Sequence, residues 1–361
     1  MVDCMTGCRP SLRIYRSKIP DVRFFEMIGG LMTEPSLLRG APLRVVITGA
    51  TGFIGTAVMS ELARVRDEEP DSASLHLRVV GRVTSEAAGS ADEWVRADLS
   101  DPGSLPECCA GADVLLHLAS VIGSDERQCA AVNIEGTAAL MAQARRAGVG
   151  RIVHLSTAAV YGRGPHRGIP VDGVAPAPVS VTSRTRLAGE GPALAAGAVV
   201  LRPSLVIGAG DRWVVPGLAR LMEATGAMWG GGRALLSLVA VGDLARLIVR
   251  LALGQGPDGG SVWHASHPEP VRTGALVRAL TGRGVLSPVD RDLSEAECLE
   301  RLVASGSRMS PRQFWMLAQD HWYDSAGIWE AAGCPPGPGP LACLDGAAVW
   351  YREYLGRPGS G

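Results

Sequence analysis

A glycine-rich turn between a strand and a helix constrains the fold of this chain more than any other feature. The short apolar run Leu43–Thr48 is typical of a parallel strand buried on both faces, and residues 56–66 predict a helix. Between them, Gly49 permits a tight turn, Gly52 lets the backbone approach a pyrophosphate, and Gly55 allows close helix–strand packing. The helix dipole then favours phosphate. We therefore predict a dinucleotide site that comprises Gly49, Thr51, Gly52, Phe53, Ile54 and Gly55.

The strand–helix alternation continues along the first half of the chain. Further strands are expected at residues 75–80, 114–118, 151–156 and 198–202, and a helix is expected at 132–147. This order predicts an α/β fold with a doubly wound parallel sheet, the Rossmann fold. Beyond about Gly208 the pattern is less regular and richer in Trp, Pro and Gly. We expect an N-terminal extension at 1–40, a dinucleotide-binding domain at 41–207, and a smaller substrate-binding or lid lobe at 208–361, some segments of which return to the core.

Composition excludes several classes of protein. The 361 residues carry a formal net charge of -1, so we expect no nucleic-acid partner and no anionic membrane surface as partner. No apolar run is long enough to cross a bilayer without a charged residue, and the N-terminus lacks the pattern of a secretory signal. The eight cysteines form no paired CxxC spacing, so no metal site is expected. The chain is expected to be reduced and cytoplasmic.

The end of the second predicted strand carries an arginine where NAD-selective folds usually place an acid. An acid there binds both ribose hydroxyls, whereas an arginine accommodates the additional phosphate of NADP. Arg82 occupies this position. The sequence therefore favours NADPH as the cofactor, with NADH as the alternative.

Several further motifs resemble those of the extended short-chain dehydrogenases/reductases, the group that contains nucleotide-sugar epimerases and dehydratases. They include the serine-rich strand motif Leu155–Gly162, the turn Leu201–Ser204 and the segment Val241–Ala245. The resemblance covers nearly everything after residue 41. It implies additional cofactor contacts from Asp98, Leu99, Leu118, Ala119, Ser120, Pro203 and Ser204.

The catalytic Tyr and Lys of that family are both replaced. Residues 178–190 align without gaps to the family's active-site helix, which puts Thr182 at the Tyr position and Arg186 at the Lys position. The chain contains no Tyr-x-x-x-Lys. We expect Arg186 to bind the cofactor ribose, because guanidinium offers several fixed donors. Thr157 and Thr182 are expected to give polar positioning only, and Tyr161 is the one phenol near the site in sequence.

These features predict an atypical NADPH-dependent ketoreductase. The chain also resembles the angucyclinone ketoreductases of antibiotic biosynthesis, which belong to this superfamily without its usual Tyr and Lys. That resemblance implies reduction of a ring carbonyl of a polycyclic aromatic polyketide, and a substrate phenol is expected to supply the proton. The segments 210–225 and 309–322 are candidate lids. A nucleotide-sugar epimerase or dehydratase and a non-catalytic NADP(H) sensor stay as alternatives, and the oligomeric state is left open. Substrate contacts are expected from Ser120, Thr157, Tyr161 and Trp213.

Overall fold

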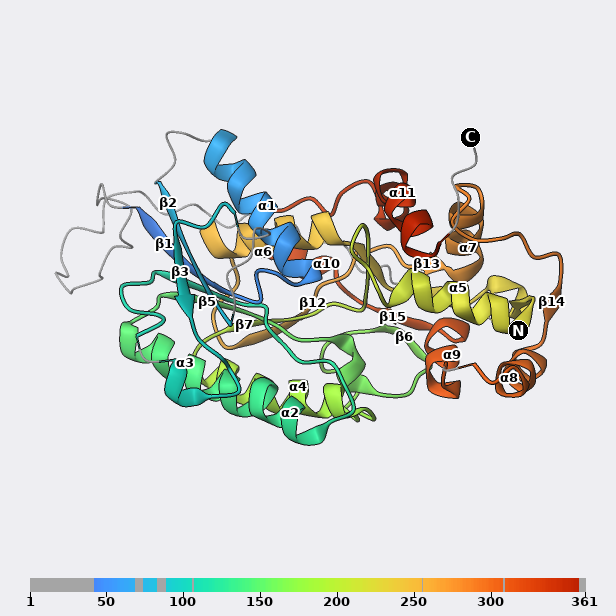
Figure 1. Ribbon diagram of the computed structural model, residues 1–361, viewed down its shortest axis with the longest axis horizontal. Helices are drawn as coiled ribbons and strands as arrows, with labels where there is room; N and C mark the ends of the chain where they lie inside the picture. Colours follow the sequence, from blue (N-terminus) through green and yellow to red (C-terminus); the bar gives the residue numbers. More distant parts are fainter. Residues whose placement is uncertain are drawn as a thin grey trace, which may run out of the picture. The chain divides into compact units, whose positions relative to one another are not determined.

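Seven parallel strands form the central sheet of the chain (Figure 1). The computed structural model describes residues 42–68, 74–82, 89–105, 107–254, 256–307 and 309–356, so the extension expected at 1–40 lies outside the described residues. Every neighbouring pair in the sheet is parallel, which confirms the predicted doubly wound fold. In sheet order the strands are β12 (Ser261–His264), β7 (Val199–Arg202), β5 (Arg151–Leu155), β4 (Val114–His117), β1 (Leu43–Thr48), β2 (Leu75–Gly81) and β3 (Glu93–Arg96).

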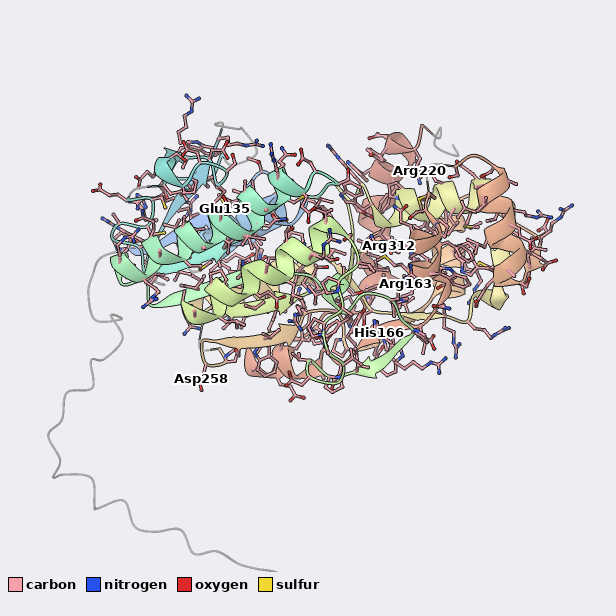
Figure 2. The ribbon with its side chains drawn as sticks, turned by 90° about the horizontal axis from the view of Figure 1, so that it is seen from below. Glu135, Arg163, His166, Arg220, Asp258 and Arg312 are labelled. Atoms are coloured by element: carbon pink, nitrogen blue, oxygen red, sulfur yellow. The ribbon has the colours of Figure 1, made fainter. Side chains whose placement is uncertain are left out.

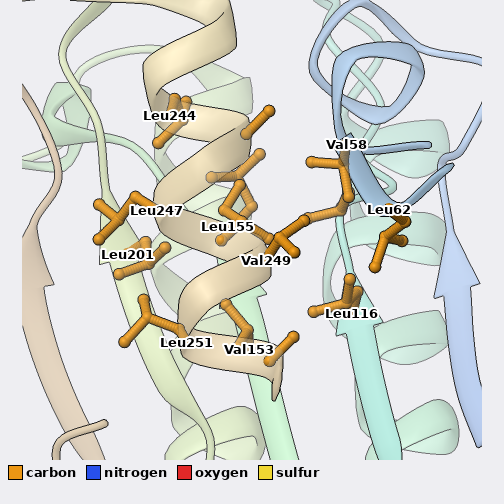
Figure 3. Close-up of a cluster of buried hydrophobic side chains, with 14 of the residues drawn as sticks. Val58, Leu62, Leu116, Val153, Leu155, Leu201, Leu244, Leu247, Val249 and Leu251 are labelled. Carbon is orange, nitrogen blue, oxygen red and sulfur yellow. The ribbon is translucent and has the colours of Figure 1, made fainter. Parts of the chain in front are cut away.

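Helices cover both faces of this sheet. Its strands are apolar on both sides, so both faces have to be shielded from water. On β1, Val45 and Ile47 pack toward one face and Val46 toward the other. The first face is covered by α1 (Phe53–Glu68) and α6 (Val241–Leu253), and Figure 3 shows leucines of α6 lying over the strands. The opposite face is covered by α3 (Thr137–Ala147) and α4 (Val181–Ala195).

The helix predicted at residues 132–147 begins earlier and changes its winding. It runs from α2 (Glu126–Ala130) through one π-helical segment, Ala131–Gly136, into α3. Asn133 lies in the π-helical segment, where its side chain accepts from the amide of Val121 (2.8 Å) and donates to the Thr185 hydroxyl (3.0 Å). Such π segments occur frequently at functional sites. Here the segment ties the loop after β4 to α4.

The residues after Gly208 contain a second hydrophobic core. Its helices are α5 (Val214–Thr225), α7 (Thr273–Thr281), α8 (Glu295–Ala304), α9 (Pro311–Ala318) and α11 (Leu344–Tyr354). The sequence analysis expected only an irregular pattern there and did not predict these helices, because most are short and many lie close to Gly or Pro. Three later elements instead belong to the first core or its sheet: α6, β12 and α10 (Ala326–Ala331).

Short strands connect the two cores. One sheet has the order β13 (Val271–Arg272), β10 (Leu235–Leu236), β15 (His321–Tyr323) and β6 (His166–Ile169). Two further pairs are β8 (Leu205–Ile207) with β11 (Leu238–Ala240), and β9 (Met228–Trp229) with β14 (Asp292–Leu293). The parallel pairing of β15 with β6 brings residues from the two halves of the sequence together. In the part of the chain that is described, no helix is both long and apolar enough to span a membrane.

Candidate active site

The glycine turn lies at the carboxyl end of β1. The Gly52 amide donates to the Gly49 carbonyl (3.1 Å), and α1 begins at the next residue. Gly49 has a φ of 75°, and a Cβ on it would lie 2.6 Å from the backbone nitrogen of Ala119. Thr51 and Gly52 are exposed, and the first amides of a helix have no partner within it. This exposed turn therefore fits the pyrophosphate of a dinucleotide.

The ends of β2 and β3 carry the residues expected at the adenosine side. Arg82 directly follows β2, and its side chain is exposed. Asp98 Oδ1 accepts from the Ser100 amide (2.9 Å) and hydroxyl (2.8 Å). The hydrogen bond from the Ser100 amide, helped by the nearby charge of Arg82, lowers the pKa of Asp98. A guanidinium and a carboxylate therefore lie near each other at this edge of the sheet.

The end of β4 is fixed by buried hydrogen bonds. His117 Nδ1 lies 2.7 Å from the Thr48 hydroxyl and its Nε2 lies 2.9 Å from the Thr137 hydroxyl. Burial, with the nearby Arg186, lowers the pKa of His117 to about 3, so this imidazole is neutral. The Leu118 amide donates to the Thr48 carbonyl (3.2 Å). The backbone that continues into Ala119 and Ser120 thus leaves the sheet beside the glycine turn.

The ends of β5 and β7 meet next to each other. The Ala158 amide donates to the Pro203 carbonyl (2.9 Å), and the Thr157 hydroxyl accepts from the Ala159 amide (3.2 Å). Thr157 and Ser204 both line the cavity described below. Thr157 and Ser204, both expected at the reactive end of the cofactor, therefore lie at the same cavity.

Main-chain groups hold both residues that replace the family's Tyr and Lys. The Thr182 hydroxyl accepts from the Gly123 amide (3.0 Å) and donates to the Gly123 carbonyl (3.1 Å). Arg186 Nη2 donates to the carbonyls of Leu155 (2.6 Å) and Ser156 (2.8 Å). Burial lowers the pKa of Arg186 to about 10, which leaves it charged at neutral pH. Thr182 therefore holds the loop after β4, whereas Nη1 and Nε of Arg186 form no hydrogen bond with a described residue.

Tyr161 is a structural residue, and its expected contact with substrate is wrong. Its side chain is 2% exposed, and its hydroxyl donates to the Val171 carbonyl (2.9 Å). The same oxygen lies 2.8 Å from Arg202 Nη1 and 2.8 Å from His264 Nε2. Arg202 in turn forms a buried ion pair with Glu190 (2.6 Å). With three partners, this phenol is not free to meet a substrate.

A cavity of about 390 Å³ lies at the carboxyl edge of the sheet beside Thr157 and Ser204. Its other walls come from Arg163, from α9 with Arg312 and Trp315, and from β15. No Asp or Glu of the described residues lines it. Volumes of this size accept a small organic molecule. The segment 309–322 expected as a lid thus forms one wall of the cavity, through α9.

Two other expected substrate contacts do not line this cavity. Trp213 is 64% exposed and lies at the start of α5, outside the cavity. Ser120 lies at the cofactor edge beside Ala119, also outside it. The difference arises because α9 and β15, which come much later in the sequence, occupy the position next to Thr157.

Sequence reasoning singled out none of five further polar residues of the cavity, although three of them lie in the segment 309–322 expected as a lid. The five are Arg163, Arg312, Gln319, His321 and Tyr323. Figure 2 labels Arg163 and Arg312, which come from different segments and lie in the same part of the molecule. Neither arginine forms an ion pair with a described residue, and loss of hydration lowers the pKa of Arg312. The pairing of β15 with β6 on one side and with β10 on the other brings His321 and Tyr323 to this place. A strand of three residues that lies far from any motif gives no sequence signal for its pairing partner.

Metal ligands are not grouped in the described part of the chain. No cluster of three or more His, Cys, Asp or Glu side chains is arranged there to hold an ion. The polar side chains of the cavity are therefore hydroxyls, one imidazole, one carboxamide and two guanidinium groups.

Comparison with known proteins gives consistent relationships. Residues 45–262 match the NAD dependent epimerase/dehydratase family. The chain is 28% identical over 281 residues to the 2-alkyl-3-oxoalkanoate reductase of Stenotrophomonas maltophilia, covering 70% of this chain and 79% of that protein. It is also 28% identical over 261 residues to the 4-hydroxy-2-methyl-3-oxo-4-farnesyl-3,4-dihydroquinoline-1-oxide ketoreductase of Stigmatella aurantiaca, covering 66% and 72%. The dTDP-glucose 4,6-dehydratase of Streptomyces venezuelae with bound NAD has the same fold, with a TM-score of 0.66, 22% identity, and coverage of 87% and 98%.

Proposed function

Because this chain belongs to the NAD dependent epimerase/dehydratase family, we propose that it is an NADPH-dependent ketoreductase acting on a ring carbonyl of a polycyclic aromatic polyketide. The substrate class is that of angucyclinones in antibiotic biosynthesis. The observation that carries the proposal is the cavity itself, which opens between Thr157 and Ser204 on one side and Trp315 on the other. An indole face and a volume of about 390 Å³ suit a flat apolar molecule.

Two relatives support reduction over epimerisation or dehydration. The two relatives at 28% identity are named as a reductase of 3-oxoalkanoates and a ketoreductase of a quinoline oxide. The second name describes a ketone in a partly saturated ring that is fused to an aromatic ring. Epimerases and dehydratases of this family depend on the Tyr that Thr182 replaces here. The proposed reaction needs only hydride delivery and one proton.

The chain's own residues supply the binding groups. The turn at Gly49–Gly55 and the start of α1 would hold the pyrophosphate, and Arg82 would hold the additional phosphate of NADP. Arg186 would donate to the ribose through its remaining nitrogens, and Ser204 would lie at the nicotinamide side. When bound, reduced nicotinamide supplies a hydride to a carbonyl carbon. The walls of the cavity exclude water and hold the ketone beside Thr157.

The test is oxidation of NADPH in the presence of a polycyclic ketone with a neighbouring phenol. We expect the absorbance of reduced nicotinamide to fall with time, and the product to be the secondary alcohol by mass spectrometry. NADH should support a slower reaction. Tight binding of NADPH without turnover of any aromatic ketone would contradict the proposal and favour a cofactor-sensing role, which the loss of the family's Tyr and Lys would also explain.

A further inference from the structure

One phenol in the cavity, Tyr323, has no hydrogen-bond partner for its hydroxyl among the described residues. Tyr323 lines the cavity together with Thr157 and Ser204, and none of the described residues hydrogen-bonds to its hydroxyl. Its backbone amide is held by the Ser237 hydroxyl (2.9 Å), so the position of the residue is fixed. The two other buried tyrosines, Tyr161 and Tyr351, each have at least two partners for their hydroxyls. The Tyr323 hydroxyl is not one of the buried unpaired polar atoms of the described residues, so it is open to the cavity, where a ligand can pair with it.

We propose that Tyr323 is the proton donor of this site, in place of the Tyr that the family carries at position 182. The proposal rests on the proposed ketoreductase function and adds a protein group to it. Tyr323 comes from β15, so it approaches the cavity from a different element than α4, which carries Thr182.

The surroundings of Tyr323 suit a neutral phenol. Its ring stacks on Tyr161 with centroids 5.5 Å apart, and His166 and His264 pack against it. Burial, and to a lesser extent Tyr161, raises the pKa of Tyr323, so the phenol keeps its proton at neutral pH. The other charged or titratable groups on the cavity wall are Arg163, Arg312 and His321.

The proposed step balances without any further reactant. The carbonyl carbon of the ketone accepts a hydride from the reduced nicotinamide, and the π pair of the C=O bond moves to the oxygen. The O–H bond of Tyr323 breaks and its proton passes to that oxygen. The products are the alcohol, the oxidised nicotinamide and a tyrosinate, which regains a proton from water. An alkoxide is far more basic than a phenolate, so the transfer is downhill.

Other groups in the cavity suit this task less well. The Thr157 hydroxyl is an aliphatic alcohol and already accepts from the Ala159 amide. Arg163 and Arg312 do not release their protons in proteins. His321 Nδ1 lies 3.1 Å from the Gln319 carbonyl oxygen. Because a carbonyl only accepts, this nitrogen carries a proton and donates it to Gln319. Burial lowers the pKa of His321, which leaves the ring neutral.

The test compares Tyr323→Phe with the matched control Tyr354→Phe, which removes a hydroxyl from a 44% exposed residue on α11. Two ketones are used: one with a free phenol beside the carbonyl, and the same compound with that phenol methylated. With the methylated ketone we expect kcat of Y323F to fall by about 100-fold or more, the usual contribution of a positioned acid. With the free phenol the fall should be much smaller, because the substrate can supply a proton. Y354F should match the native chain.

Two measurements separate a catalytic effect from damage to the fold. Tm and NADPH affinity of Y323F should equal those of the native chain, because no protein group loses a partner. Affinity for the methylated ketone in the presence of oxidised cofactor should weaken by about fivefold, the value of one hydrogen bond. An unchanged kcat and unchanged ketone affinity in Y323F would overturn the assignment of Tyr323 alone. No turnover of either ketone by the native chain would instead overturn the proposed reductase.

Discussion

At the residue scale, the two replacements in the active-site helix are structural as well as chemical. Thr182 pairs with both backbone groups of Gly123, and Arg186 pairs with the last carbonyl of β5 and the one after it. A phenol at position 182 could not make both of these short contacts from the same Cα, because its oxygen lies several bonds further out. The loop after β4 is therefore adapted to Thr182, and the acid has to come from elsewhere.

Cofactor preference is a second property that belongs to one residue. Arg82→Ala should weaken NADPH binding by about tenfold and change NADH binding little, because only NADPH carries a phosphate for this guanidinium. Fluorescence titration of both cofactors measures the two affinities. Arg145→Ala, which changes an exposed arginine at the end of α3, serves as the control. Equal losses for NADPH and NADH in R82A would contradict the role given to Arg82.

The sequence predicts those site residues whose positions depend on local structure, and it misses those whose positions depend on contacts between distant segments. Thr157 and Ser204 could be placed because each lies just beyond the carboxyl end of a strand of the parallel sheet, with one residue between. Tyr161 was misplaced because its three partners come from segments up to 103 residues away. Tyr323 could not be found at all, since its position depends on a strand pairing between distant segments.

At the scale of elements, α9 forms one wall of the cavity. It begins with a capping box, in which the Ser310 hydroxyl accepts from the Gln313 amide (3.3 Å) and Gln313 Oε1 accepts from the Ser310 amide (2.8 Å). Pro311 follows at the first helical position, where its fixed φ is favourable. One side of the helix buries Phe314 in the second core, and the other presents Arg312 and Trp315 to the cavity.

Destabilising the start of α9 should therefore weaken binding of the substrate more than binding of the cofactor. Ser310→Ala removes the cap and should cost about 1 kcal/mol of helix stability. We expect KM for the ketone to rise several-fold, with kcat and NADPH affinity close to native. Ser294→Ala is a matched control, because it removes the same kind of capping box from α8, which does not line the cavity. An equal rise in KM for S294A would show that general destabilisation, not the wall, is responsible.

The fold itself was predictable wherever periodicity is strong. Short apolar runs located β1, β2, β4, β5 and β7 to within a residue at each end, because strands buried on both faces read as continuous apolar segments. The lobe was harder, since strands of two or three residues such as β9, β10 and β15 carry no measurable period. Their pairings are set by the packing of the helices around them.

At the scale of the whole molecule, neutral histidines lie buried near the junction of the two cores and under the cofactor edge. Burial is the main cause that lowers the pKa of five of the seven, among them His117 to about 3 and His264 to about 4. The others are His154, His166 and His321. His154 stacks on His117 with centroids 4.9 Å apart, and its buried Nδ1 has no hydrogen-bond partner among the described residues.

These histidines make the folded chain sensitive to mild acid. Below the unfolded pKa of about 6.5, the unfolded state binds protons that the folded state refuses, so stability falls as the pH falls. Each histidine with a folded pKa near 3 or 4 should cost about 2 kcal/mol between about pH 7 and pH 5, as measured by urea unfolding at a series of pH values. His154→Leu should remove the contribution of His154, whose pKa burial also lowers, and so flatten the curve. The cost near pH 7 should be small, because the imidazole it replaces leaves a buried nitrogen unpaired. A pH dependence in H154L equal to that of the native chain would mean that His154 is already protonated in the fold, which two stacked imidazoles beside a buried guanidinium would strongly oppose.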